Sequence, residues 1–218
     1  TSTSCSGRPW GSEMTPLWIG TNNAKKLAEL TRLLAPLGVT LRTPKDLGAP
    51  FEPVEDQPDF AGNARKKAAL LAELAGAVAV ADDSGLCVDA LDGRPGVRSA
   101  RYGGPGLDDR GRLLKLLEEL QGVPAARRTA RFVCSLCVAA PDGRVLAAIE
   151  RSCEGVLRER PTGEGGFGYD PIFVPVEHKD DMTQSFAVLD ATVKDRLSHR
   201  GKALRALVEQ LPDLLAGR

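Results

Sequence analysis

The first apolar segment of the chain is Leu17–Gly20, which has the length of a short strand. Leucines at helical spacing follow it, and Asn23 stands where a residue can cap their helix. Pro36 and Gly38 are placed to end that helix, and Val39–Arg42 can return as a second strand. The apolar stripe consists of Leu27, Leu30, Leu34 and Leu37. The pattern therefore predicts a strand–helix–strand opening.

The rest of the chain continues to alternate between strand-like and helical patterns. Lys45–Asp59 has three prolines and several acids and is predicted to be a loop. A short apolar strand is predicted to end at Asp82-Asp83. Thr129–Ala140 and Arg144–Cys153 alternate like strands on either side of Pro141-Asp142-Gly143, which predicts a hairpin. The predicted helices and the short strand are Asn63–Ala75, Val78–Ala81, Asp108–Leu120 and Gly201–Leu211. This order indicates an α/β fold.

No linker divides this pattern, so we predict one domain over residues 14–218. Thr1–Glu13 is polar and lacks the apolar centre of a secretory signal. We expect these residues to form a disordered extension, with Met14 as the native start. Apolar runs nowhere approach the roughly 20 residues of a membrane span, so no membrane association is expected.

Composition narrows the possible partners. The 218 residues include 29 basic and 29 acidic side chains, so no polyanion-binding surface is indicated and no nucleic-acid partner is expected. Of five cysteines, Cys134 and Cys137 form a C-x-x-C in a predicted strand, where their side chains point to opposite faces. No second pair completes a zinc site. Reduced cysteines in a cytoplasmic protein fit this usage best.

Polar residues stand between the first strand and the first helix. The free N–H groups of a helix N-terminus attract anions, and nearby lysines add charge suited to phosphate. The alternative is an Asn-capped helix with two solvated lysines. The candidate residues are Thr21, Asn22, Asn23, Ala24, Lys25 and Lys26.

A pair of acids follows the predicted strand Val78–Ala81. Carboxylates such as Asp82 and Asp83 are hard oxygen ligands suited to Mg²⁺, and one of them could deprotonate a water molecule. Ligand sites in α/β sheets gather at the carboxyl ends of strands. The alternative is an Asx-type turn that closes the strand.

A glycine-rich segment, Gly163–Asp170, lets the backbone approach a ligand closely and adds the aromatic rings of Phe167 and Tyr169. Donors follow in Ser198–Gly201. A flat slot with donors suggests a nucleotide. The alternatives are a glycine-rich turn entering a strand and a helix start capped by Ser198.

Taken together, four motifs resemble the inosine/xanthosine triphosphate pyrophosphatase family, over about residues 17–211. The motifs are Asp82–Leu86 with Val88–Leu91, Pro95–Tyr102, Gly165–Phe173 and Ser198–Gly201. The resemblance implies an elongated mixed β-sheet flanked by helices, with two lobes and the active site in the cleft between them. It also implies a homodimer that uses Mg²⁺ to hydrolyse ITP, dITP or XTP to the monophosphate and pyrophosphate. Such activity removes deaminated purines from the nucleotide pool.

The resemblance also assigns roles to individual residues. Asp83 corresponds to the general base and, with Glu55, to a metal ligand. Lys67 corresponds to a second phosphate-binding lysine, in addition to Lys26. Sequence alone would select neither Glu55 nor Lys67. Ser84 corresponds to a phosphate-contacting hydroxyl. The residues around base and sugar are Phe167, Gly168, Tyr169, Asp170, Lys194, His199 and Arg200.

Purine chemistry suggests how such a site selects its base. Hypoxanthine and xanthine present a 6-oxo acceptor and an N1–H donor, and adenine presents the reverse. A donor such as Arg200 facing O6, with an acceptor such as Asp170 near N1–H, would leave the groups of adenine unpaired. This reasoning does not explain how guanine is rejected.

Three positions depart from the family pattern. Asn22 and Lys25 replace two glycines of the phosphate segment, and Gly62 stands where the family usually has Glu. Two other functions remain open at this point. One is a Maf-like pyrophosphatase acting on modified pyrimidine nucleotides, although Ser198–Gly201 and Gly165–Phe173 argue against it. The other is a nucleotide-binding regulator that has lost catalysis.

Overall fold

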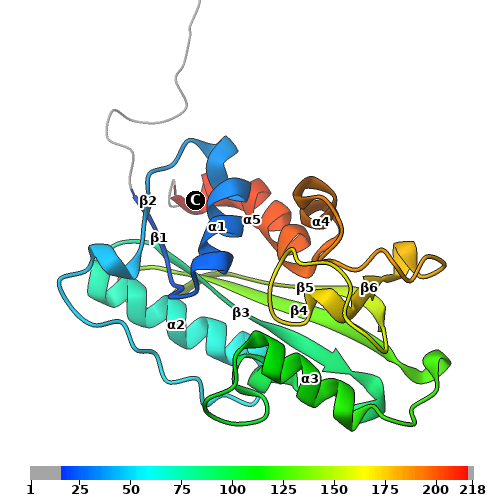
Figure 1. Ribbon diagram of the computed structural model, residues 1–218. Coiled ribbons are helices and arrows are strands. Elements are labelled where there is room, and N and C mark those ends of the chain that lie inside the picture. The colour runs from blue at the N-terminus through cyan, green and yellow to red at the C-terminus, as the bar shows by residue number, and fades with distance from the viewer. Residues whose placement is uncertain (1–15, 216–218) are drawn as a thin grey trace, which may run out of the picture.

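The computed structural model describes residues 16–215, which form one six-stranded mixed sheet with helices packed on both faces (Figure 1). The expected extension Thr1–Glu13 lies outside these residues. The strand order is β2-β1-β3-β4-β5-β6. The strands are β1 (Leu17–Ile19), β2 (Leu41–Arg42), β3 (Ala79–Val88), β4 (Thr129–Ala139), β5 (Val145–Leu157) and β6 (Phe173–Pro175). The predicted mixed sheet flanked by helices is confirmed, and the division into two lobes stays a prediction.

The strand–helix–strand opening is also confirmed. β1 pairs in parallel with β2 and β3, and α1 (Ala24–Leu34) connects β1 to β2. The Asn23 side chain caps α1 by accepting hydrogen bonds from the backbone N–H groups of Lys25 and Lys26. After a single turn of 3₁₀ helix, Gly38 adopts φ 63°, a left-handed conformation in which glycine is unstrained. The cap points the start of α1 toward the sheet edge beside β3.

β3 corrects the sequence prediction, because it does not end at Asp82-Asp83 but continues to Val88. β1 pairs with β3 only as far as Ile19 opposite Val80, whereas β4 pairs with β3 along its whole length. The acids therefore lie within a long strand that pairs with β4 on one edge, while on its other edge the next bridge after β1 joins Cys87 to Pro95. The apolar run in the sequence is shorter than the strand, because the strand carries polar residues where it borders a pocket.

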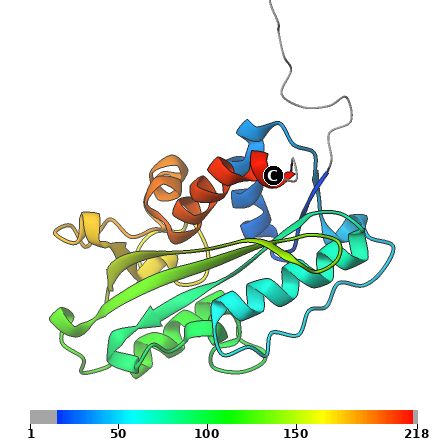
Figure 2. The same cartoon turned by 180° about the vertical axis from the view of Figure 1, so that it is seen from behind.

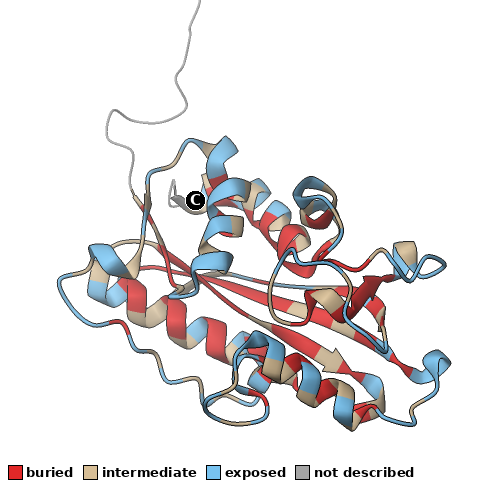
Figure 3. Ribbon diagram, viewed as in Figure 1, coloured by how far each residue is buried: buried red, intermediate tan, exposed pale blue. Residues whose placement is uncertain are grey.

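Helices cover the two faces of the sheet differently. α2 (Phe60–Ala75) packs through Ala64, Ala68 and Leu71 on the face that carries Cys137. The opposite face carries one apolar cluster beneath α1 and α5 (His199–Leu215) and another beneath α3 (Asp109–Glu119). α4 (Ala191–Leu197) precedes α5 (Figures 1 and 2). Buried residues run along β3, β4 and the inner side of α2 (Figure 3).

The β4–β5 hairpin confirms the predicted alternation. Cys134 lies in the cluster beneath α1 and α5, and Cys137 lies in the cluster beneath α2, so the two thiols point to opposite faces. Between residues 16 and 215 no helix is long and apolar enough to cross a membrane.

Candidate active site

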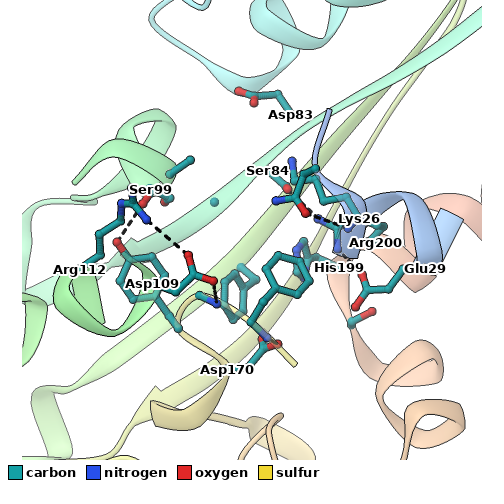
Figure 4. Close-up of a pocket in the computed structure, with 18 of the residues that line it drawn as sticks. Lys26, Glu29, Asp83, Ser84, Ser99, Asp109, Arg112, Asp170, His199 and Arg200 are labelled. Atoms are coloured by element: carbon teal, nitrogen blue, oxygen red, sulfur yellow. Dashed lines mark hydrogen bonds and ion pairs between the residues drawn. The ribbon is translucent and has the colours of Figure 1, made fainter. Parts of the chain in front are cut away.

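A pocket opens beside β3 and is lined by residues from both faces of that strand, among them Asp83 and Ser84. Its empty space, open mouth included, is about 870 Å³, within the usual range for small-molecule sites. Side chains from α1, α4 and α5 line one side, and side chains from α3 line the other (Figure 4). A more open hollow adjoins this pocket and shares Asn23, Lys26 and Glu55 with it. The two form a continuous trough.

The pleat of β3 separates the two adjacent acids. Asp82 and Ser84 point toward α1 and α5, whereas Asp83 points toward α2, away from Ser84 in Figure 4. This follows from strand geometry, in which successive side chains project to opposite faces. The acids that are neighbours in sequence therefore have different environments.

Asp82 is surrounded by cations. Its carboxylate lies 2.9 Å from Lys26 Nζ and 3.4 Å from Arg200 Nη2, and it accepts a hydrogen bond from the Ser84 hydroxyl at 3.2 Å. Burial by itself would raise the pKa of Asp82, but Lys26, Arg200 and Lys67 together outweigh that effect and hold the pKa well below its usual range. Asp82 therefore stays ionised at neutral pH and anchors the cations around it.

Asp83 has fewer charge partners. Lys67 Nζ donates to one carboxylate oxygen at 2.9 Å, and Asn63 Nδ2 donates to the other at 3.1 Å. The Asn63 carbonyl oxygen accepts the backbone N–H of Gln57, which fixes the direction of its amide. Burial raises the pKa of Asp83 above its ordinary value, although Lys67 opposes the shift. This carboxylate is the one poised to accept a proton.

Glu55 joins the Asp83 cluster from the loop before α2. One carboxylate oxygen of Glu55 lies 2.9 Å from Lys67 Nζ, and the other accepts a hydrogen bond from Arg101 Nη1 at 2.9 Å. Two carboxylates, from Glu55 and Asp83, thus converge on one ammonium. Within residues 16–215 no group of three acidic, His or Cys side chains could hold a metal.

The aromatic end of the trough is built around Phe167. The centroid of its ring lies 5.2 Å from Lys194 Nζ and 5.7 Å from the Arg200 guanidinium carbon. Asp170 accepts hydrogen bonds from the Phe167 backbone N–H and from Lys194 Nζ, both at 2.8 Å. A Cβ at Gly166 would lie only 2.1 Å from the Asp170 carboxylate, so this close approach requires glycine.

His199 and Arg200 begin α5, which Ser198 caps through the Gly201 N–H. His199 is buried and stacks on Phe132, with ring centroids 4.8 Å apart. Burial and the neighbouring cations Arg200, Lys194 and Lys26 hold the pKa of His199 well below its usual value, so the ring stays neutral at physiological pH.

Glu29 is a pocket residue that the sequence reasoning missed. It accepts a hydrogen bond from Lys194 Nζ at 3.0 Å and pairs with Arg200, and so ties α1 to α4 and α5. Burial would raise the pKa of Glu29, but Arg200 and Lys194 outweigh it and lower that pKa. Glu29 stands three residues after Lys26, on the same helix face. That spacing could have indicated from the sequence that Glu29 faces the pocket. Other pocket residues missed were Ser99, Asp109 and Arg112.

The trough brings together all but two of the predicted site residues. Ala24 and Lys25 line neither part of it. Lys25 is largely exposed and lies 3.7 Å from Asp109 across the mouth of the pocket. Asn22, one of the two glycine replacements, donates its amide to the Phe51 backbone carbonyl at 3.2 Å. It therefore ties the phosphate segment to the loop that carries Glu55.

Gly62, the third departure, is closely packed. A Cβ at this position would lie 2.8 Å from Gln57 Cβ and 3.1 Å from an Asp59 carboxylate oxygen. Asp59 caps α2 by accepting the Gly62 N–H. A glutamate at this position would require Gln57 to move.

A model of the Ham1 family matches residues 17–210. The dITP/XTP pyrophosphatase of Desulforamulus reducens is 49% identical over 195 residues, which cover 89% of this chain and 94% of that protein. The dITP/XTP pyrophosphatase of Thermus thermophilus is 48% identical, covering 89% of this chain and 91% of that protein. The solved structure of a HAM1 protein from Coxiella burnetii superimposes with a TM-score of 0.82 at 34% identity, covering 92% of this chain and all of that one.

Proposed function

Because this chain belongs to the Ham1 family, we propose that it hydrolyses the non-standard purine nucleoside triphosphates ITP, dITP and XTP to the monophosphate and pyrophosphate. It is thus a nucleoside-triphosphate pyrophosphatase that removes deaminated purines from the nucleotide pool. The observation that carries the proposal is the trough itself. A ring with cations beside it lies at one end, and lysines with a proton-accepting carboxylate lie at the other.

The donor set at the phosphate end fits Mg²⁺. This ion is usually held by one or two carboxylates together with phosphate oxygens, and Glu55 and Asp83 supply two carboxylates. We propose that these two residues hold it. Mg²⁺ held by Glu55 and Asp83 would supply positive charge to offset the charge that develops on the phosphate oxygens.

Asp83 is proposed as the general base. Its raised pKa suits it to take a proton from the attacking water, and Asn63 and Lys67 fix the direction of its two oxygens. Lys26 and Lys67 would hold the triphosphate and stabilise the leaving pyrophosphate. Both lysines are already directed into the trough by their contacts with Asp82 and Asp83.

Selection of the base is proposed to involve Arg200 and Asp170. Both Nη atoms of Arg200 are engaged by Glu29 and Ser84, whereas its Nε has no hydrogen-bond partner among residues 16–215. We propose that an N–H of the Arg200 guanidinium outside these contacts donates to the 6-oxo group. Adenine would leave that donor unpaired, and sites that rely on such bonds can reject a mismatch by up to ~10⁴–10⁵.

The direct test is pyrophosphate release from ITP, XTP, dITP, GTP and ATP, each with and without Mg²⁺. Rapid Mg²⁺-dependent release from ITP and XTP, with little from ATP or GTP, is expected. Arg200→Ala should weaken the preference for ITP over ATP, and an unchanged preference would remove Arg200 from base selection. Binding of ITP without any release would instead favour a nucleotide-binding regulator.

We also propose a homodimer in the cytoplasm. Cys87, Cys134, Cys137 and Cys153 are free thiols, which fits a reducing compartment. Light scattering on the purified protein would test the dimer by giving twice the mass of 23.2 kDa.

A further inference from the structure

Within residues 16–215, both lysines at the phosphate end of the trough are already paired with acids. Lys26 is paired with Asp82, and Lys67 is paired with both Glu55 and Asp83. A triphosphate brings several negative charges, so these two lysines can contribute fully to binding it only if some of the pairs exchange partners. Glu55 is the least buried of the three acids, with 31% of its side chain exposed, and is therefore the pair member most open to exchange.

Arg101 is the second cation on Glu55. Its Nη1 lies 2.9 Å from the Glu55 carboxylate, and its Nη2 donates to the Glu55 backbone carbonyl at 3.0 Å. Lys67 holds the other oxygen of the same carboxylate. Nearly half of the Arg101 side chain is exposed, so it can turn without unpacking a core. Arg101 directly follows Ala100, which lines both parts of the trough.

We propose that Arg101 is a further phosphate-binding residue, held by Glu55 in this structure and released to the pyrophosphate end of the substrate when Glu55 is neutralised. The inference rests on the proposed function. Arginine suits this role because its planar fork donates two parallel hydrogen bonds to a carboxylate or to a phosphate, but its donors cannot serve both at once. In this structure the Glu55 carboxylate therefore accepts the Arg101 hydrogen bond that a phosphate group would accept from it.

One consequence is a coupling between the two ligands. A divalent cation that binds the Glu55 carboxylate would remove the anchor of Arg101. It would also remove one of the two contacts of Lys67. Arg101 then becomes available to the phosphates, and Lys67 keeps only its pair with Asp83. Binding of the cation and of pyrophosphate should therefore reinforce each other by the same factor in both directions.

The coupling can be tested without metal and without turnover. Binding of inorganic pyrophosphate is measured by calorimetry in EDTA for the wild-type protein and for Glu55→Gln. Removing the Glu55 charge should free Arg101 and strengthen metal-free binding about 10-fold, the scale of one charge-assisted hydrogen bond. Glu52→Gln is the matched control, because Glu52 also lines the trough but forms no ion pair with any residue in 16–215. It removes the same charge without releasing a cation and should change binding only about 2-fold.

Arg101 is then tested in the Glu55→Gln background. Adding Arg101→Gln should cancel most of the gain. Adding Arg98→Gln should not, because Arg98 lies in the same 3₁₀ segment (Gly96–Arg101) and forms no ion pair with the described residues. Arg101→Lys should keep part of the gain, since it retains the charge but not the fork. Thermal melting of each variant checks that it is folded.

Equal gains from Glu55→Gln and Glu52→Gln would overturn the proposal, and so would a gain that survives Arg101→Gln. No metal-free binding by any folded variant would overturn it as well. Because the assay follows pyrophosphate binding, these outcomes are independent of ITP hydrolysis. A protein that shows the expected binding pattern but does not hydrolyse ITP would refute the proposed function and leave the role of Arg101 supported.

Discussion

Asp82 and Asp83 are adjacent in sequence and identical in chemistry, yet the two faces of β3 give them opposite properties. Asp82 meets Lys26 and Arg200 on the α1 and α5 side, and its pKa is lowered. Asp83 meets one lysine and one amide on the α2 side, and its pKa is raised. The number of cations on each face decides which acid stays charged and which can take a proton.

The comparison shows why a pair of acids on a strand should not be treated as one unit. The pleat directs Asp82 to the ion pairs that hold α1 and α5 against the sheet and leaves Asp83 for the proposed proton transfer. Single substitutions at the two positions should therefore affect different measurable quantities.

The largest expected effect is on turnover at Asp83. Asp83→Asn keeps the shape of the side chain but removes the proton acceptor, so kcat for pyrophosphate release should fall by ~10²–10⁴. Binding of ITP should be largely unchanged, as measured by calorimetry. Full activity in this variant would show that Asp83 is not the base.

Asp82→Asn should act on stability. Removing one member of a buried ion pair leaves Lys26 and Arg200 short of a counter-charge, and the free energy of unfolding in urea should fall by about 3 kcal/mol. Asp89→Asn is the control, because Asp89 is half-exposed and its pair with Arg131 should contribute less than about 1 kcal/mol. Equal losses at the two positions would contradict the distinction between a buried and an exposed acid.

At acidic pH, protonation of Asp82 and of Asp83 should change the free energy of unfolding in opposite directions. The native pKa of Asp82 lies below the ordinary 3.8, so its stabilisation is complete above that value and is lost as pH falls toward the native pKa. The native pKa of Asp83 lies above 3.8, so acidification through this range partly offsets that loss. Between about pH 5 and pH 3, Asp82→Asn should lose stability less steeply than wild type, and Asp83→Asn more steeply. Urea titrations at several pH values measure both slopes, and slopes that change in the same direction would refute the assignment.

Lys25 and Lys26 are a second pair of sequence neighbours in different environments. The expected effect of substituting them, on KM, is smaller. Lys26 is mostly buried against Asp82, whereas Lys25 lies in solvent, 3.7 Å from Asp109. Exposed pairs contribute little, so Lys25→Gly should change KM for ITP by less than about 3-fold. Lys26→Gln should raise KM clearly more, and equal effects would mean that Lys25 also reaches the phosphates.

Local features of the fold could be predicted from the sequence. The Asn23 cap, the leucine stripe of α1 and the β4–β5 hairpin depend on neighbours in the chain, and all three are present. The length of β3 could not be predicted, because it depends on where β1 stops on one side and on how far β4 extends on the other.

The same limit applies to the site. Glu55 and Lys67 entered only through the resemblance to a known family, because twelve residues and a loop separate them in the chain. Arg101 and Asn63 gave no signal, since their contacts with Glu55 and Asp83 arise only when the loop, α2 and β3 pack together. The roles of these residues in catalysis stay predictions.

The pairing of charges in the trough also bears on how fast a nucleotide arrives. Five carboxylates of the trough each have a basic partner, so these groups together project little net field into the solvent. Electrostatic steering accelerates association only where one sign of charge prevails. The acids are Glu29, Glu55, Asp82, Asp83 and Asp170, and the bases are Lys26, Lys67, Arg101, Lys194 and Arg200. Nucleotides should therefore enter by ordinary diffusion, at a rate that salt changes little, and be selected by contacts made after arrival.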